Sequence, residues 1–193
     1  MGSEPGLKTA PIVLLDANLL YPFHLRNLLV QLGVHQLIDV RWTDRIHDEW
    51  IDNLVASGKV NRARLNRTRD IMKRVLPNAT VSNYENRIFN LTLPDPDDRH
   101  VLAAAIEAGA SILLTFNLRD FPTEAMAPFA IAAREPDGFL CEIHDEDPEA
   151  AVAAAEAACE NLSISAPTML EFVDFLERQR LMNFAKRLRA AQG

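Results

Sequence analysis

The sequence predicts an α/β fold in which a central parallel sheet is flanked by helices and followed by a C-terminal helical appendage. Short apolar runs such as residues 12–15 and 112–115 are typical of parallel strands buried on both faces. Helical patterns alternate with them at short spacing, as in βαβ units. The composition then becomes alanine-rich and acidic after about Asp145. We therefore expect one domain over residues 10–144 and a helical extension over residues 145–193.

The first part of the domain alternates strands with amphipathic helices. Each helix is predicted from apolar residues at three- and four-residue spacing, and each boundary from a capping residue or a glycine. The expected elements are a strand at 12–15, a helix at 22–32 that ends at Gly33, a strand at 38–42, a helix that Thr43 caps, and a polar helix at about 60–76.

The second part repeats this alternation and leads into the helical extension. The expected elements are an extended piece near 80–82, a helix from Asp97 or Asp98 to Gly109, a strand at 112–115, a last strand within 129–133, and two or three C-terminal helices. The apolar stripe of those helices is compatible with accessory stabilisation, with a homodimer contact or with docking of a partner protein.

The overall composition is that of an ordinary folded protein, with 48% apolar and 24% charged residues among 193. A net charge of −7 excludes a uniformly basic nucleic-acid-binding surface but allows a local basic strip. Two cysteines cannot form a disulfide framework. The apolar stretch at 12–20 is interrupted by Asp16 and Asn18 and is too short to span a bilayer. We expect a soluble cytoplasmic protein with no membrane partner.

Four short acidic segments carry the functional prediction. Two of them follow predicted strands, and two lie at or near helix starts, so their side chains can converge at the carboxyl edge of the sheet. Converging carboxylates repel one another unless a cation neutralises them, so the pattern predicts a divalent-metal site. The segments contain Asp16, Glu49, the trio Asp95, Asp97 and Asp98, and Asn117 with Asp120.

Each segment also has a purely structural interpretation. Asp16 can be the N-cap of the next helix, although Asn18 would cap it equally well and leave Asp16 free. Glu49 can be a solvated surface residue, and one or two aspartates of the trio can be caps. The functional interpretation therefore depends on the four segments together.

The oxygen-rich donor set favours Mg²⁺ or Mn²⁺, which prefer hard ligands and keep several waters. Zn²⁺ fits poorly, because the five histidines show no paired ligand spacing. A metal held by a ring of carboxylates suits in-line attack of activated water on a phosphodiester.

At these residues the chain resembles the PIN domain, the fold of many small metal-dependent ribonucleases, including VapC-type toxins. The resemblance covers roughly residues 10–135 and is carried by LLDANLL, DRIHDEW, LPDPDDRHVLAAAIEAGA and LLTFNLRDF. It implies a three-layer sandwich, an endoribonuclease acting with Mg²⁺ or Mn²⁺, an RNA substrate and a cognate antitoxin.

The resemblance also implies roles for particular residues. Asp16, Glu49 and Asp98 would be the catalytic metal ligands, and Asn117 or Asp120 would complete the set. Many PIN domains carry an aspartate where Asn117 stands, so a second metal is less well supported than the first. Asp95 and Thr115 are candidates to contact and orient these ligands without binding the metal themselves.

A basic segment at residues 59–74 is the candidate RNA-binding surface. Its cations would contact phosphates and make binding depend on salt. The purely structural interpretation is a solvated helix held by Leu65, Ile71 and Met72. If the segment does bind a partner, an acidic antitoxin segment is the alternative to RNA. The cations are Lys59, Arg62, Arg64, Arg67, Arg69, Lys73 and Arg74.

Competing functions are weighed on single positions. A haloacid-dehalogenase-type phosphatase is excluded, because it needs an aspartate where Asn18 stands. A receiver-type module needs a lysine after a late strand, and the late strands here offer none in that place. The alternative that stays open is a catalytically inactive PIN-like binding or scaffold protein. The sequence does not separate an RNA-directed from a DNA-directed nuclease.

Overall fold

The structure is a computed structural model and describes residues 9–58, 60–162 and 165–191. These residues form a four-stranded parallel sheet with the strand order β2-β1-β3-β4. The strands are β1 (Ile12–Leu15), β2 (Asp39–Arg41), β3 (Ile112–Leu114) and β4 (Ala132–Arg134). The predicted fold class is confirmed.

The central strand β1 explains how the first acidic residue is placed. It pairs with β2 on one side and β3 on the other, with Leu14 opposite Arg41 and Leu113. Its residues Val13, Leu14 and Leu15 are fully buried. Burial on both faces accounts for the uninterrupted apolar run. Asp16 follows at the carboxyl edge, where ligands bind in open α/β sheets.

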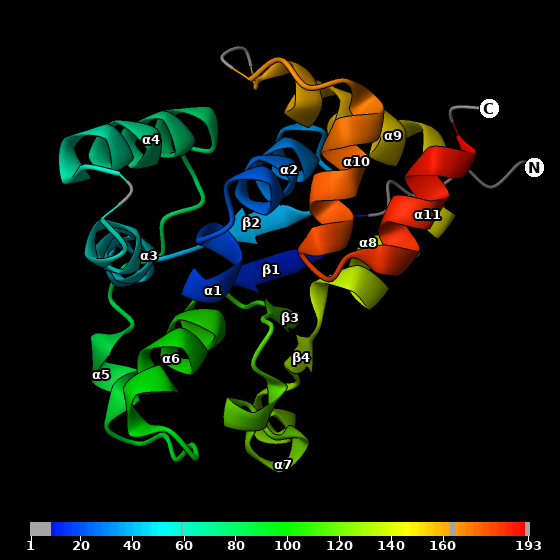
Figure 1. Ribbon diagram of the computed structural model, residues 1–193. Helices are drawn as coiled ribbons and strands as arrows, with labels where there is room; N and C mark the ends of the chain where they lie inside the picture. The colour runs from blue at the N-terminus through cyan, green and yellow to red at the C-terminus, as the bar shows by residue number, and fades with distance from the viewer. Residues whose placement is uncertain (1–8, 59, 163–164, 192–193) are drawn as a thin grey trace, which may run out of the picture.

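Helices cover both faces of the sheet (Figure 1). Helix α2 packs against β2, and α6 packs against β1 and β3 from the other side. The longer helices are α2 (Phe23–Val34), α3 (Asp44–Ala56), α4 (Arg62–Val75), α6 (Arg99–Glu107), α8 (Pro136–Glu146), α9 (Pro148–Glu160), α10 (Met169–Arg178) and α11 (Met182–Ala190). The short ones are α1 (Ala17–Leu20), α5 (Glu85–Ile88), α7 (Thr123–Met126) and the 3-10 turns Pro96–Asp98, Leu118–Asp120 and Ala127–Phe129.

Helices α3 and α4 form a pair beside the sheet (Figure 1). Thr43 caps α3 as predicted, since its hydroxyl accepts a hydrogen bond from the Ile46 amide at 3.0 Å. Asn61 caps α4 in the same way, by accepting from the Arg64 amide at 2.9 Å. Trp50 and Ile51 of α3 are fully buried, whereas α4 buries mainly Leu65 and Met72.

The C-terminal helices pack onto the rest of the chain. Helix α9 lies along α2, and α11 packs against α8 and α10. Phe172, Leu176 and Phe184 are fully buried in the continuous core. The apolar stripe therefore serves intramolecular stabilisation, although Leu170 and Met182 stay more than half exposed.

The structure corrects two predicted boundaries. Gly33 does not end its helix but lies within the last turn of α2, where a Cβ would meet Leu76 and Val40 at 3.0 Å. Close packing against these side chains, not a turn, favours glycine there. The last strand begins at Ala132, because a 3-10 turn at 127–129 and a left-handed Ala130 (φ 55°) occupy the expected start.

Among the described residues, no helix has the length and apolar character needed to cross a membrane.

Candidate metal centre

The predicted acidic residues meet at the carboxyl end of β1. A pocket of about 430 Å³ opens there between α1, α3 and α6. It is lined by Asp16, Ala17, Asn18, Tyr21, Glu49, Asn53, Asp98 and Asn117. Three carboxylates from separate parts of the chain thus share one pocket, and none of these lining side chains is cationic.

Asp16 is the most buried of the three, with 8% of its surface exposed. It caps α1, because Oδ1 accepts a hydrogen bond from the Ala17 amide at 2.6 Å. Asn18 therefore does not replace Asp16 as the cap. The other oxygen, Oδ2, accepts from Thr115 Oγ1 at 2.7 Å and Asn18 Nδ2 at 2.6 Å. Asp16 is both a structural cap and a pocket carboxylate.

Thr115 and Asn18 lock this corner of the pocket. The strands β1 and β3 are neighbours, so Thr115, which follows β3, lies beside Asp16. The Thr115 hydroxyl also accepts from Asn18 Nδ2 and from the Asn117 amide, both at 2.9 Å. Asn18 Oδ1 accepts from the Phe116 amide at 3.2 Å. These bonds fix the orientation of the Asp16 carboxylate.

Glu49 enters the pocket from α3 and is about one-third exposed. Its Oε1 lies 2.8 Å from Nε2 of His100, a buried residue of α6. The same oxygen accepts from Arg45 Nε at 3.3 Å, one turn earlier on α3.

Asp98 is half-buried and is the last residue of a 3-10 turn, directly before α6. Asp95 caps this turn by accepting a hydrogen bond from the Asp97 amide at 2.8 Å. Partial burial, the negative charge of Asp16 and contact with Asp120 raise the pKa of Asp98 to about 7. Burial is also the main reason that the pKa of Asp16 is raised, and Glu49 adds to it. Asp97 is exposed and does not line the pocket.

Two side chains lie where a fourth metal ligand is predicted, Asn117 and Asp120. Asn117 lines the pocket and donates a hydrogen bond from Nδ2 to Asp120 Oδ2. Asp120 in turn hydrogen-bonds with Asp98. An amide oxygen and a further carboxylate therefore stand beside the three acidic residues.

The donor set suits a hard divalent cation by its chemistry. It consists of oxygen atoms. Besides burial, the charge of Glu49 raises the pKa of Asp16 and the charge of Asp16 raises the pKa of Asp98, which a cation would counter. Among the described residues, no group of three or more His, Cys, Asp or Glu side chains is already arranged to hold an ion. Mg²⁺ keeps several waters, so carboxylates of a wider pocket can bind it partly through water.

Two lining residues, Asn53 and Tyr21, and the buried Glu49 partner His100 were not predicted from the sequence. Asn53 lies one turn after Glu49 on α3, and that four-residue spacing is a signal that could have revealed it. Tyr21 and His100 carry no such signal, because their positions depend on how helices α1, α3 and α6 cross.

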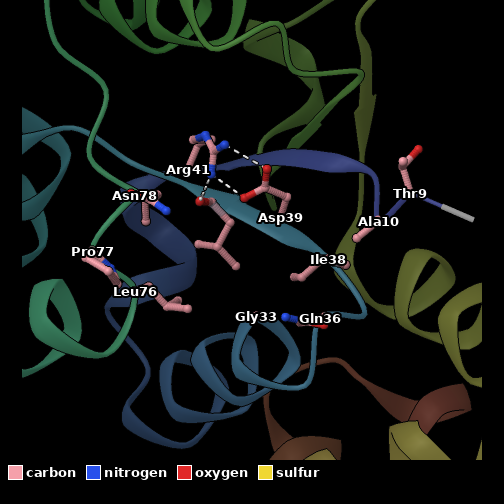
Figure 2. A pocket seen from close by; sticks show the side chains of 12 residues that line it. Thr9, Ala10, Gly33, Gln36, Ile38, Asp39, Arg41, Leu76, Pro77 and Asn78 are labelled. Atoms are coloured by element: carbon pink, nitrogen blue, oxygen red, sulfur yellow. Dashed lines mark hydrogen bonds and ion pairs between the residues drawn. The ribbon is translucent and has the colours of Figure 1, made fainter. Parts of the chain in front are cut away.

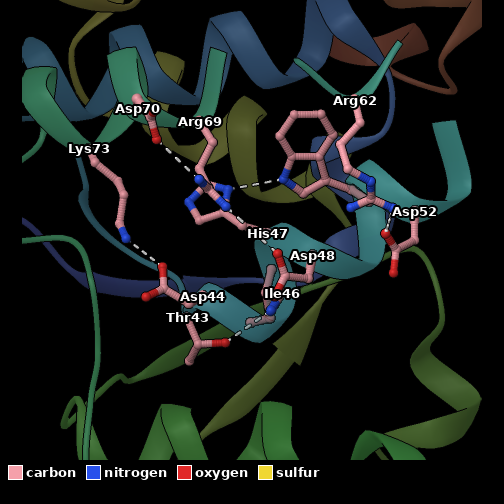
Figure 3. A network of polar contacts seen from close by, with 11 residues as sticks. Thr43, Asp44, Ile46, His47, Asp48, Asp52, Arg62, Arg69, Asp70 and Lys73 are labelled. Carbon is pink, nitrogen blue, oxygen red and sulfur yellow. Dashed lines mark hydrogen bonds and ion pairs between the residues drawn. The ribbon is translucent and has the colours of Figure 1, made fainter. Parts of the chain in front are cut away.

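The basic helix α4 is divided into two faces. One face pairs with an acidic stripe of α3, as Figure 3 shows. The pairs are Lys73 with Asp44, Arg69 with Asp48 at 3.7 Å, and Arg62 with Asp52. The acidic residues recur every four positions, so they lie along one side of α3. We call these three pairs the ion-pair ladder.

The face of α4 turned away from the ladder carries the remaining cations. Arg64, Arg67 and Arg74 recur at three- and seven-residue spacing, which places them on one side of the helix. All three are exposed, and among the described residues none of them forms an ion pair. Lys59 lies outside the described residues.

A second pocket, of about 490 Å³, lies at the edge strand β2 (Figure 2). Asp39 and Arg41 face each other there in an ion pair, and the other lining residues are mostly apolar or uncharged. With its one carboxylate neutralised, this pocket lacks the convergent acidic groups of the first.

Comparison with known proteins agrees with this geometry. A family model described as "PIN domain" matches residues 12–119, more than half of the chain. The chain belongs to the PIN-domain family. A second model, "VapC50 C-terminal domain", matches residues 136–190 and places the chain among VapC-type members.

One curated relative is the protein named "Putative ribonuclease VapC50" of Mycobacterium tuberculosis strain H37Rv. It is 51% identical to this chain over 43 residues, 22% of the chain. The match spans a quarter (25%) of that protein's length. No solved structure matches the chain significantly.

Proposed function

We propose that this PIN-domain protein is an endoribonuclease that depends on Mg²⁺ or Mn²⁺. The observation that carries the proposal is the convergence of Asp16, Glu49 and Asp98 in one pocket without a lining cation. Carboxylates held together in this way are typical of sites that bind divalent metal ions. The name of the curated relative supports RNA as the substrate.

In this proposal Asp16, Glu49 and Asp98 hold the cation, and Asn117 or Asp120 completes its surroundings. When bound, the cation lowers the pKa of a water molecule and stabilises negative charge on the phosphate. Thr115 and Asn18 keep Asp16 in place, so that little reorganisation is needed during the reaction. Without a cation, burial and the neighbouring carboxylates raise the pKa of Asp98 to about 7, which a bound cation would lower.

We further propose that Arg64, Arg67 and Arg74 contact RNA phosphates. They are the exposed cations of α4 that the ladder leaves free, whereas Arg62, Arg69 and Lys73 are already neutralised.

Membership of the VapC type supports a role as the toxin of a toxin–antitoxin pair. Both cysteines, Cys141 and Cys159, are buried free thiols, as suits a reducing cytoplasm.

Cleavage of a total-RNA pool tests the proposal. Wild type and Asp98→Asn are incubated with Mn²⁺ or with EDTA, and Asp52→Asn serves as a matched control outside the pocket. Discrete fragments should appear with wild type and with the control, and only with Mn²⁺. Fragments that persist in Asp98→Asn would contradict the proposal. Retained Mn²⁺ binding without cleavage would favour a binding protein on a nuclease fold.

A further inference from the structure

We infer that His100 is a positioning residue that aims the Glu49 carboxylate into the pocket and thereby sets the affinity of the site for a divalent cation. This inference rests on the metal site proposed above. The proposed function does not itself assign any role to a histidine.

The ring of His100 connects two of the elements that build the pocket. His100 is the second residue of α6, two positions after Asp98, and is 2% exposed. Its Nε2 lies 2.8 Å from Glu49 Oε1 on α3. One hydrogen bond from a rigid, buried ring therefore sets where Glu49 stands relative to Asp98.

Glu49 has little else to hold it. Among the described residues its other polar contact is Arg45, at 3.3 Å. The Arg45 side chain is 48% exposed and belongs to the same helix. Such exposed pairs one turn apart are weak. A glutamate side chain has several rotatable bonds, and ordering it costs entropy. The buried partner on another helix is thus the contact that fixes its direction.

The second ring nitrogen supports the same assignment. His100 Nδ1 is buried and has no hydrogen-bond partner among the described residues. A hydrogen on Nδ1 would be a buried unpaired donor, so the ring carries it on Nε2, where Glu49 accepts it.

His47 provides a matched control. It is also fully buried and also leaves one nitrogen, Nε2, without a partner. Its Nδ1 accepts a hydrogen bond from Trp50 at 3.0 Å, so its polar contact is with the core and not with a pocket carboxylate. Removing His47 should disturb packing without moving Glu49.

The experiment measures Mn²⁺ affinity by calorimetry and the melting temperature in EDTA for wild type, His100→Leu, His100→Gln and His47→Leu. His100→Leu should weaken Mn²⁺ binding about 10- to 100-fold, as for other residues that orient metal ligands. His100→Gln should restore most of the affinity, since its amide can donate from nearly the same place as Nε2. His47→Leu should lower the melting temperature and leave the affinity unchanged.

Several results would overturn the inference. Wild-type affinity in His100→Leu, or equal losses in the Leu and Gln variants, would show that the ring only fills space. If His100→Leu does not fold, His100→Met gives the same comparison with a more adaptable side chain. Absence of Mn²⁺ binding by wild type would overturn the proposed function as well, whereas normal wild-type binding would confine the failure to His100.

Discussion

The two acidic faces of helix α3 have opposite surroundings. On one face Asp44, Asp48 and Asp52 each meet a cation of α4. On the other, Glu49 points into a pocket that it shares with Asp16 and Asp98. Acidic residues on one helix are thus neutralised by α4 at one face. At the other face the pocket lining supplies no cation, and Glu49 has only the exposed pair with Arg45.

The contrast separates acidic residues that only form surface ion pairs from acidic residues that can bind a ligand. Exposed ion pairs contribute little to stability and nothing to chemistry. Carboxylates that are partly buried and face other carboxylates are destabilising. The pKa of Asp98 is raised for both reasons, and such groups persist where a ligand makes use of them. Neutral substitutions of acidic residues in the pocket and on the ladder face should therefore have different effects.

The largest expected effect is on catalysis. Asp98→Asn removes a ligand charge, and we expect cleavage to fall on the order of 10³-fold, because metal assistance supplies several kcal/mol. Asp16→Asn should behave similarly. Gel analysis of Mn²⁺-dependent RNA cleavage measures this, with Asp48→Asn as the control from the ladder face. Equal losses in Asp48→Asn would remove the distinction between the two faces.

The next effect concerns RNA binding by the two faces of α4. We expect the triple change of Arg64, Arg67 and Arg74 to Gln to reduce the slope of log affinity against log salt by about 2–3. The matched triple change of Arg62, Arg69 and Lys73 to Gln removes the same charge from the ladder. Its slope should stay close to that of wild type.

Fluorescence anisotropy with a labelled RNA at several salt concentrations measures both slopes. Asp98→Asn is used as the background, so that cleavage does not interfere. Equal slopes for the two triple variants would show that the free face of α4 is not the RNA surface.

A smaller effect links the pocket to pH in the metal-free protein. The pKa of Asp98 is about 7 in the folded chain against 3.8 as its ordinary value, so between these the folded state binds more protons. Stability therefore falls as pH rises from about 4 to 7. Asp98→Asn should be more stable than wild type by about 1–2 kcal/mol above pH 7, after allowance for solvent screening of a half-buried group.

Thermal unfolding in EDTA across this pH range measures the difference. The two proteins should converge at about pH 3, below the ordinary pKa of 3.8, because Asp98 is then mostly neutral in both states. A variant that is less stable than wild type at pH 8 would show that Asp98 has a stabilising structural role instead.

An effect of similar size, spread over three residues, is expected at the ladder. Changing Asp44, Asp48 and Asp52 together to Asn should cost about 1–2 kcal/mol of stability, since each exposed pair contributes about 0.2–1 kcal/mol. Added salt should shrink this difference, because it screens exposed charges. Denaturant unfolding at low and high salt checks it. A loss that is independent of salt would indicate a packing defect.

The sequence predicted those parts of the molecule that depend on local patterns. The strand at 12–15 and the cap at Thr43 follow from residue order alone, and so does the placement of Asp16 at a strand end. The convergence of Asp16 and Asp98 follows from α/β topology, because a helix that leads into a parallel strand begins at the carboxyl edge of the sheet, where Asp16 also lies.

The remaining features depend on tertiary contacts. The ladder requires α3 and α4 to lie side by side, and the bond between His100 and Glu49 requires α3 and α6 to meet. Gly33 resembles a helix stop in sequence, but its reason is the closeness of Leu76 and Val40. Such contacts join residues far apart in the chain, which periodicity does not reveal.

The most direct test of the central claim is a calorimetric titration of Mn²⁺ into wild type, Glu49→Gln and Asp52→Asn. Both substitutions remove one negative charge from α3, but from opposite kinds of surroundings. We predict that Glu49→Gln weakens binding at least about tenfold, whereas Asp52→Asn binds as wild type does. Equal affinities for all three proteins, or no binding by wild type, would contradict the account.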